Sequence, residues 1–285
     1  MALTLEAPAD AQAAKITLRT VQQWARRGEP FAMLTCYDAT TARWLWRGGV
    51  RCLLVGDTAA QMILGHDTTL PATMPFMLQI TAAVRRGAPQ AFLMADMPFG
   101  SYQGGHHRAV GNAIAFLKKT GADSVKLELD GSRTALVQEL TRAGVPVVAH
   151  LGSRPQQVRA NGGYRAAGRT RHEAAELVAA AGSLVDMGAV MVLLEAVPNE
   201  VTEQIVAGVS GADPAVPVIG CGAGNACHGH VVVLQDLLGM SDWHPPFAQP
   251  MADLGAQIQR TAGDWVKMVS SGQYLKDDHP YRMDP

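Results

Sequence analysis

Short apolar runs alternate with longer amphipathic stretches along most of the chain. Seven runs are rich in aliphatic and β-branched residues and have the length of strands: 31–37, 50–56, 91–95, 124–129, 146–151, 190–196 and 217–220. An eighth run, 231–235 (VVVLQ), fits a strand and a short helix about equally well. The runs are continuously apolar, which is typical of parallel strands that are buried on both faces.

Helical patterns fill the intervals between these predicted strands. The clearest are 106–119, 132–143 and 171–187. Glycines stand shortly before several of the following strands, at Gly49, Gly121, Gly144 and Gly188. Glycine commonly ends a helix because it accepts the left-handed backbone conformation.

Seven or eight strand–helix units within 285 residues predict an α/β protein of the (β/α)8 barrel type. A doubly wound open sheet is the alternative architecture. We expect one barrel domain over residues 21–285, which carries the catalytic site, and a flexible N-terminal extension over residues 1–20.

Composition and charge exclude several classes of protein. Hydrophobic residues make up 48% of the chain, charged residues 17%, and the net charge is −1. The chain can therefore bury a large core, and it lacks the basic excess of a protein that binds nucleic acids or membrane surfaces. It has no apolar stretch of membrane length, no secretion-signal pattern and no CxxC pair. We expect a cytoplasmic protein whose partners are small molecules and further subunits.

Polar residues end or follow most of the predicted strands. They are Asp38, Asp57, Asp96, Lys126, Glu128, His150 and Glu195. The carboxyl ends of all strands in a parallel barrel meet at one face, where such enzymes carry their catalytic groups. A single acid after a strand is more often a helix N-cap. Because six strands share the pattern, we predict a functional cluster at one mouth of the barrel.

Carboxylates that crowd together need protons or a cation, because like charges repel strongly at short range. Oxygen ligands without paired Cys or His favour Mg²⁺, ahead of Mn²⁺ and Zn²⁺. A 2-oxo acid can chelate such an ion through a carboxylate oxygen and its keto oxygen, which acidifies the adjacent carbon. A carboxylate that does not bind the metal could then act as the general base.

Ten ordered blocks of this sequence resemble the ketopantoate hydroxymethyltransferase family. They are LTCYD (34–38), VGDT (55–58), GHDTTLP (65–71), AAVRRGAP (82–89), ADMPFGSY (95–102), VKLE (125–128), AHLGSRPQ (149–156), GGYRAAGR (162–169), LLEAVP (193–198) and IGCGAGN (219–225). The resemblance implies a (β/α)8 barrel that assembles as a homo-decamer. It also implies transfer of a hydroxymethyl group from 5,10-methylenetetrahydrofolate to 3-methyl-2-oxobutanoate, which gives 2-dehydropantoate (ketopantoate) in pantothenate and coenzyme A biosynthesis.

The resemblance further implies roles for individual residues. Asp57 and Asp96 correspond to metal-binding aspartates, and Glu128 to a further acid at the metal, directly or through water, with one Mg²⁺ per subunit. The residues that contact the substrate correspond to Asp57, Thr58, Asp96 and Lys126. Glu195 corresponds to the proton acceptor that generates the enolate. We expect His150 to hydrogen-bond within the site, without a catalytic step of its own.

Three positions depart from the pattern of the family. Thr58 stands where serine is common, Leu129–Asp130 where the family has two glycines, and His228–Gly229–His230 where it has Asp-Gly-Gln. These changes leave the specificity for substrate and folate open. The group Cys221, Cys227, His228 and His230 lacks the ligand spacing of familiar zinc sites. We expect a loop there that meets the folate or a neighbouring subunit.

Two other functions compete with hydroxymethyl transfer. One is a Mg²⁺-dependent lyase or mutase of the phosphoenolpyruvate mutase and isocitrate lyase type, although the KKCGH-like loop of those enzymes is missing from this sequence. The other is a catalytically silent paralogue that binds a keto acid. The joint presence of Asp57, Asp96, Lys126, Glu128 and Glu195 argues against a silent protein, because such a protein has no chemical need for a metal site and a base.

Overall fold

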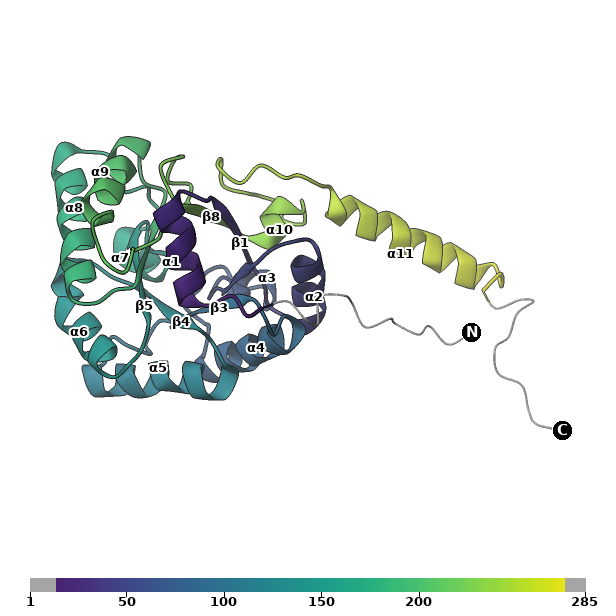
Figure 1. Ribbon diagram of the computed structural model, residues 1–285. Coiled ribbons are helices and arrows are strands. Elements are labelled where there is room, and N and C mark those ends of the chain that lie inside the picture. Colours follow the sequence, from purple (N-terminus) through teal and green to yellow (C-terminus); the bar gives the residue numbers. More distant parts are fainter. Residues whose placement is uncertain (1–13, 275–285) are drawn as a thin grey trace. The chain divides into compact units, whose positions relative to one another are not determined.

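The computed structural model describes residues 14–274 and contains a closed barrel of eight parallel strands (Figure 1). The strands are β1 (Phe31–Thr35), β2 (Cys52–Val55), β3 (Phe92–Asp96), β4 (Ser124–Glu128), β5 (Val147–Gly152), β6 (Met191–Glu195), β7 (Val218–Cys221) and β8 (Gly229–Val232). Each strand pairs with its neighbours in chain order, and β8 closes the barrel by pairing with β1. The predicted barrel is confirmed, and the open sheet is excluded.

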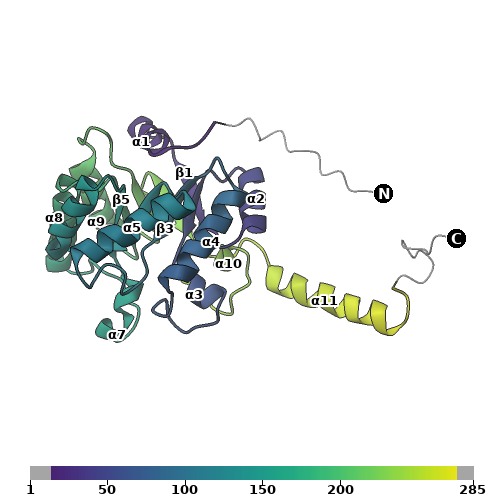
Figure 2. The same ribbon diagram turned by 90° about the horizontal axis from the view of Figure 1, so that it is seen from below.

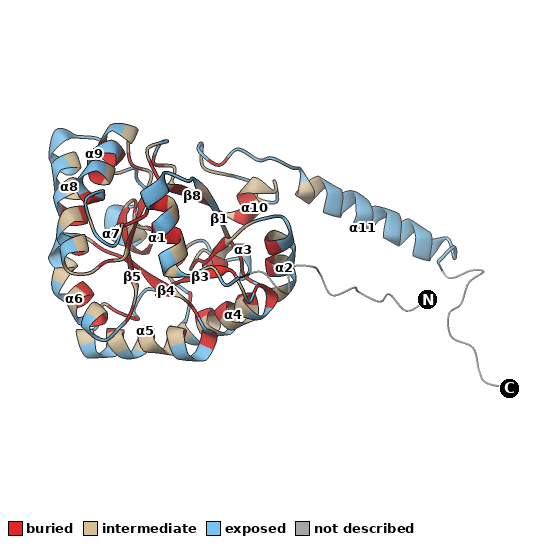
Figure 3. Cartoon of the chain, in the orientation of Figure 1, coloured by how far each residue is buried: buried red, intermediate tan, exposed pale blue. Residues whose placement is uncertain are grey.

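Helices surround the barrel and cover its two ends. They are α1 (Leu18–Arg27), α2 (Ala39–Arg47), α3 (Ala59–Met62), α4 (Met74–Gly87), α5 (His106–Thr120), η2 (Gly131–Arg133), α6 (Thr134–Arg142), η3 (Pro155–Gln157), α7 (Val158–Asn161), α8 (Arg171–Asp186) and α9 (Asn199–Val209). The buried residues lie on the strands and on the sides of the helices that face them (Figure 3). The three predicted helices correspond to α5, α6 and α8.

The glycines that were expected to end helices have the predicted conformation. Their φ angles are 91° at Gly49, 73° at Gly121, 77° at Gly144 and 102° at Gly188. All four lie in the left-handed region that a residue with a side chain rarely adopts. These glycines let the chain turn back into the next strand.

The last strand is shifted from the predicted run 231–235. β8 begins at Gly229 and ends at Val232, and the short helix α10 (Leu234–Leu237) begins two residues later. The run is therefore part strand and part helix. At Gly229, an added Cβ would lie only 2.5 Å from the ring of Phe31, so the close approach of β8 to β1 requires a glycine.

The chain divides into two compact units, Met1–Val232 and Val233–Pro285. The first contains the barrel, and the second contains α10 and α11 (Leu254–Ser270). Residues 1–13 of the predicted extension lie outside the described residues, and α1 begins at Leu18. Within residues 14–274, none of the helices combines the length and apolarity that a bilayer span requires.

Apolar side chains fill the amino-terminal half of the barrel interior. Val21 of α1 is fully buried and belongs to the same cluster as the inward-facing Met33, Phe92 and Met191. Figure 2 shows α1 at one end of the barrel and the short helices α3 and α7 at the other. Because the end beneath α1 is closed by packing, polar groups can gather in the interior only at the end that carries α3 and α7.

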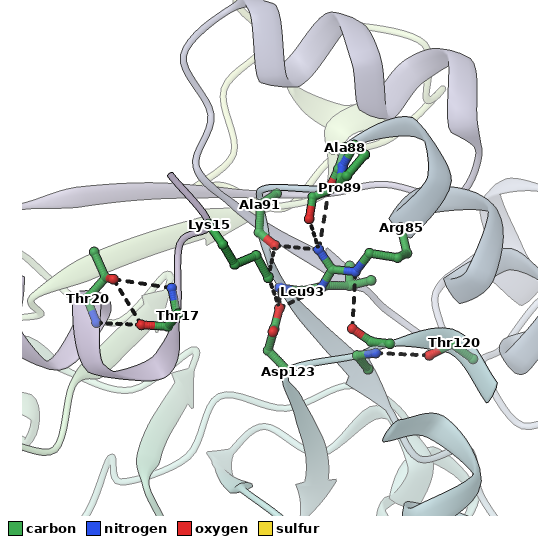
Figure 4. A network of polar contacts seen from close by, with 12 residues as sticks. Lys15, Thr17, Thr20, Arg85, Ala88, Pro89, Ala91, Leu93, Thr120 and Asp123 are labelled. Carbon is green, nitrogen blue, oxygen red and sulfur yellow. Dashed lines mark hydrogen bonds and ion pairs between the residues drawn. The ribbon is translucent and has the colours of Figure 1, made fainter. Parts of the chain in front are cut away.

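A polar network ties the amino-terminal ends of β3 and β4 together (Figure 4). Asp123 Oδ2 accepts hydrogen bonds from Lys15 Nζ at 2.7 Å, from Arg85 Nη2 at 2.5 Å and from the backbone N–H of Leu93 at 2.8 Å. Arg85 also donates to the backbone oxygen of Ala91 at 2.7 Å. The block AAVRRGAP, one of the ten that carry the resemblance, thus contributes to stability at the end remote from the polar strand ends.

Candidate active site

Six of the predicted polar residues lie together at the carboxyl ends of five neighbouring strands. Asp57 follows β2, Asp96 ends β3, Lys126 and Glu128 are on β4, His150 is on β5, and Glu195 ends β6. Strand register places Asp96 beside Lys126 and Glu128 beside His150. Five of the six are buried, and the side chain of Glu195 is 24% exposed. Glu195 is therefore the member of the cluster that opens toward solvent.

Asp96 links the first half of this cluster. Its Oδ1 lies 2.8 Å from Lys126 Nζ, and its Oδ2 accepts the backbone N–H of Asp57 at 3.0 Å. Burial by itself would lower the pKa of Lys126, but the negative charges around it, Asp96 foremost, raise that pKa above its ordinary value. Lys126 is thus a permanent buried cation that can face a carboxylate or a developing oxyanion.

His150 connects Lys126 to Glu195. Its Nδ1 lies 3.2 Å from Lys126 Nζ, and its Nε2 lies 3.4 Å from Glu195 Oε2. Burial and the charge of Lys126 lower the pKa of His150, which keeps the ring neutral at pH 7. Because an ammonium group can only donate, Nδ1 accepts and the ring proton is on Nε2, directed toward Glu195.

Gln156 is the residue of this site that the sequence did not reveal. Its Nε2 donates to Asp57 Oδ2 at 2.8 Å, and its backbone N–H donates to both oxygens of Glu128 at 3.1 Å. Its Oε1 accepts from the hydroxyl of Tyr102 at 2.7 Å. Gln156 is uncharged and lies in η3, beyond the strand end, so a search for titratable residues at strand ends passes over it. Its presence in the block AHLGSRPQ was the one available signal.

The charges of the cluster fit a divalent cation. Burial, and then the charge of Asp96, raises the pKa of Asp57 to about 7, and burial and the charge of Asp57 raise the pKa of Glu128 well above its ordinary value. A hard cation among these oxygens would relieve the cost of burying like charges together. Within residues 14–274, no three His, Cys, Asp or Glu side chains stand in the arrangement of a formed metal site. The fit therefore depends on charge and donor type.

Asp38 does not join the cluster, contrary to the expectation from its place after a strand. It is the N-cap of α2, where its Oδ1 accepts the backbone N–H groups of Thr40 and Thr41, each at 2.8 Å. Its Oδ2 accepts from the hydroxyl of Thr41. Both carboxylate oxygens are engaged locally, so this acid serves helix formation.

Three of the residues that depart from the family pattern have identifiable partners. The hydroxyl of Thr58 hydrogen-bonds the hydroxyl of Tyr37 at 2.7 Å, beside the carboxylates. Asp130 pairs with Arg154 at 2.5 Å and caps η2, so its carboxylate is engaged by these two contacts. His228 Nδ1 accepts the backbone N–H of Val218 at 3.0 Å, which is a structural contact between the ends of two strands.

Two solved structures have a similar fold. A crystal structure of 2,3-dimethylmalate lyase, described as a member of the PEP mutase/isocitrate lyase superfamily, matches with a TM-score of 0.60 and 16% identity, and covers 95% of this chain and 93% of that one. A phosphonopyruvate hydrolase in complex with oxalate and Mg²⁺ matches with a TM-score of 0.59 and 12% identity, over 94% of this chain and 92% of that one. At these identities the likeness concerns the fold alone.

Sequence relatives are much more similar. The 3-methyl-2-oxobutanoate hydroxymethyltransferase of Mycobacterium ulcerans is 40% identical over 276 residues, which cover 95% of this chain and 91% of the relative. The enzyme of the same name from Mycobacterium tuberculosis is 40% identical over 269 residues, with 94% and 93% covered. The family model for ketopantoate hydroxymethyltransferase matches residues 15–277. This chain belongs to the ketopantoate hydroxymethyltransferase family.

Proposed function

We propose that this protein transfers a hydroxymethyl group from 5,10-methylenetetrahydrofolate to 3-methyl-2-oxobutanoate and so forms 2-dehydropantoate. The observation that carries the proposal is the buried cluster of Asp57, Asp96 and Glu128 next to the cation Lys126, with Glu195 at its solvent-facing edge. A 2-oxo acid presents a carboxylate, a ketone and an acidic C3–H, and each has a chemical counterpart in this cluster.

Asp57 and Asp96 would hold one Mg²⁺, with Glu128 as a further acid directly or through water. When bound, the ion polarises the keto group and makes the C3–H more acidic. Lys126 Nζ, held at 2.8 Å by Asp96, is positioned to stabilise negative charge that develops on the substrate oxygens. The hydroxyl of Thr58 and the carboxylates beside it would line the place of the keto acid.

Glu195 would act as the general base. Its carboxylate takes the C3 proton, and the electron pair of the C–H bond forms the carbon–carbon double bond of the enolate. C3 then attacks the one-carbon unit of the folate. Both bonds between that carbon and the folate nitrogens break, a water molecule supplies the hydroxyl group, and the nitrogens take up protons as tetrahydrofolate leaves. His150, whose Nε2 lies 3.4 Å from Glu195 Oε2, would orient the carboxylate by donating a hydrogen bond.

Further parts of the proposal extend the family's properties to this chain. We propose that residues 21–285 contain the catalytic barrel domain, that the protein acts in the cytoplasm, and that it assembles as a homo-oligomer, a decamer by resemblance. Its partners would be a small 2-oxo acid and a reduced folate. Relatives that bear the name of this activity at 40% identity support it over the lyase and mutase alternative.

One assay series tests the proposed function. The purified protein is supplied with 3-methyl-2-oxobutanoate, 5,10-methylenetetrahydrofolate and Mg²⁺, and 2-dehydropantoate is followed by mass spectrometry. We expect product that disappears with EDTA or without folate, while exchange of the C3 proton in D₂O persists without folate. Glu195→Gln should abolish both turnover and exchange. Turnover that is indifferent to EDTA, or cleavage of a 2-oxo acid without folate, would contradict the proposal.

A further inference from the structure

The segment 153–172 is strongly basic, although the protein as a whole is not. It contains five arginines and no aspartate or glutamate, in a chain whose net charge is −1. The segment leads from the end of β5 through α7 to the start of α8. Since it follows a strand at its carboxyl end, it lies on the same face of the barrel as the carboxylate cluster.

Tyr164 connects this segment to the active site. Its hydroxyl lies near the side chain of Gln61, which is in α3. Both α3 and α7 lie at the end of the barrel away from α1 (Figure 2). The tyrosine is close enough to the cluster to sense the charges of Asp57, Glu195 and Glu128, yet it remains 51% exposed. Tyr164 thus forms a rim between the cluster and the rest of the basic segment.

Two cavities lie along the segment beyond this rim. One of about 560 Å³ is lined by Tyr164, Arg165 and Arg169. The other, of about 740 Å³, shares Arg165 and includes Arg154. Each has the size of a pocket for a small organic molecule. Glu173 borders both, but its Oε2 already accepts the backbone N–H groups of Arg169 and Thr170.

Most arginines of the segment have no intramolecular partner within the described residues. Arg154 pairs with Asp130, but Arg159, Arg165, Arg169 and Arg171 are exposed, and no guanidinium of these four makes a hydrogen bond or an ion pair with the described part of the chain. Arg171 is in the first turn of α8, where a positive charge does not favour the helix. Arg165 and Arg169 line one cavity together, and neither forms an ion pair within the described part of the chain, so an anionic ligand would find a prepared surface there.

We propose that Tyr164, Arg165 and Arg169 form the binding site for the carboxylate-bearing glutamate tail of the folate co-substrate. This inference rests on the proposed function. The folate must deliver its one-carbon unit to the cluster, and its glutamate tail must then leave the mouth across the rim. The exposed ring of Tyr164 offers a stacking surface for the aromatic part, and the arginines beyond it match carboxylates by bidentate hydrogen bonds. The keto acid is too small to need cavities of this size.

Folates that differ in the number of glutamates test the proposed tail site. Tetrahydropteroate, its monoglutamate and its triglutamate are titrated into the Mg²⁺-loaded protein with the keto acid present, and binding is measured by calorimetry. We expect affinity to rise along this series, by about tenfold or more overall, and to fall again in high salt. The double variant Arg165→Gln/Arg169→Gln should bind all three ligands about equally. Arg142→Gln changes an exposed arginine at the carboxyl end of α6 and is the matched control. This variant should keep the preference for the triglutamate.

The failures of the two proposals are distinguishable. Exchange of the C3 proton needs no folate and reports whether the keto-acid site is intact in the double variant. Product formation with no preference for the triglutamate, or with a preference that survives in the double variant, would overturn the tail site alone. If the wild-type protein neither forms product nor binds any of the three folates, the proposed function fails and the tail site fails with it.

Discussion

The side-chain amide of Gln156 donates a hydrogen bond of 2.8 Å to Asp57 Oδ2, although the two residues are 99 positions apart. The backbone N–H of Gln156 also holds both carboxylate oxygens of Glu128. One residue therefore orients two of the three acids that we propose for the metal site. Groups that orient metal ligands commonly matter nearly as much as the ligands themselves.

Gln156→Leu should weaken Mg²⁺ binding by about tenfold to a hundredfold. The change removes the group that donates to Asp57 Oδ2 and the buried oxygen that accepts from the hydroxyl of Tyr102. The backbone N–H that donates to Glu128 remains. Mg²⁺ affinity is measured by calorimetry, and the Mg²⁺ dependence of turnover by steady-state kinetics. Gln157→Leu, at the next position of η3, is the control. Equal affinity in wild type and Gln156→Leu would rule out an orienting role.

Asp96→Asn should lower the affinity for Mg²⁺ by at least about tenfold, because it removes a proposed ligand charge. It should also weaken binding of the keto acid, because it takes away the acid that holds Lys126 Nζ at 2.8 Å. Calorimetric titrations with Mg²⁺ and with the keto acid measure the two effects separately. Asp67→Asn changes an exposed acid in the loop after α3 and should leave both affinities unaltered. Unchanged metal affinity in Asp96→Asn would remove Asp96 from the ligand set.

The metal-free protein should lose stability as the pH rises from about 4 to about 7. Burial and Asp96 raise the pKa of Asp57 to about 7, whereas an unfolded aspartate has a pKa of about 4. In that range the folded state binds a proton that the unfolded state releases, so this contribution to stability is complete below about pH 4 and lost above about pH 7. Mg²⁺ competes with the same proton, and its affinity should rise over the same range.

Denaturant unfolding in EDTA at several pH values measures this dependence. The difference between wild type and Asp57→Asn isolates the contribution of Asp57, since asparagine does not titrate. We expect the wild type to become less stable relative to the variant as the pH increases, by about 1.4 kcal/mol for each unit of pKa shift. If the free energies of unfolding of wild type and Asp57→Asn differ by a constant amount between pH 5 and pH 8, Asp57 is ionised throughout that range.

Asp123→Asn should destabilise the barrel by about 1–3 kcal/mol without changing the chemistry. Asp123 Oδ2 accepts from Lys15, Arg85 and the backbone N–H of Leu93, and the side chain of Arg85 is only 16% exposed. Loss of the carboxylate leaves that partly buried cation without its counter-charge. Urea unfolding measures the change, and Asp186→Asn, an exposed acid at the end of α8, is the control. A large fall in turnover at full stability would contradict a purely structural role.

Local sequence was sufficient for the repeat of strand and helix. Apolar runs and the glycines before them predicted seven strands closely, because chain reversal at Gly121 or Gly188 is a property of a few neighbouring residues. The eighth strand was misplaced by two residues, since VVVLQ satisfies strand and helix alike and pairing with β1 begins at Gly229. Once parallel strands were expected, barrel topology predicted which strand ends would meet.

The partners of each polar group were decided only by tertiary structure. Asp38 and Asp57 both follow apolar strands, but Asp38 finds two free N–H groups at the start of α2, whereas Asp57 turns inward to Gln156. Gln156 has neither a charge nor a place at a strand end, so its role exists only where β2, β4 and η3 converge. The sequence alone therefore determined the fold, the family and the face that carries the acids. The long-range hydrogen bonds that orient those acids depend on distances between segments, which a linear pattern does not contain.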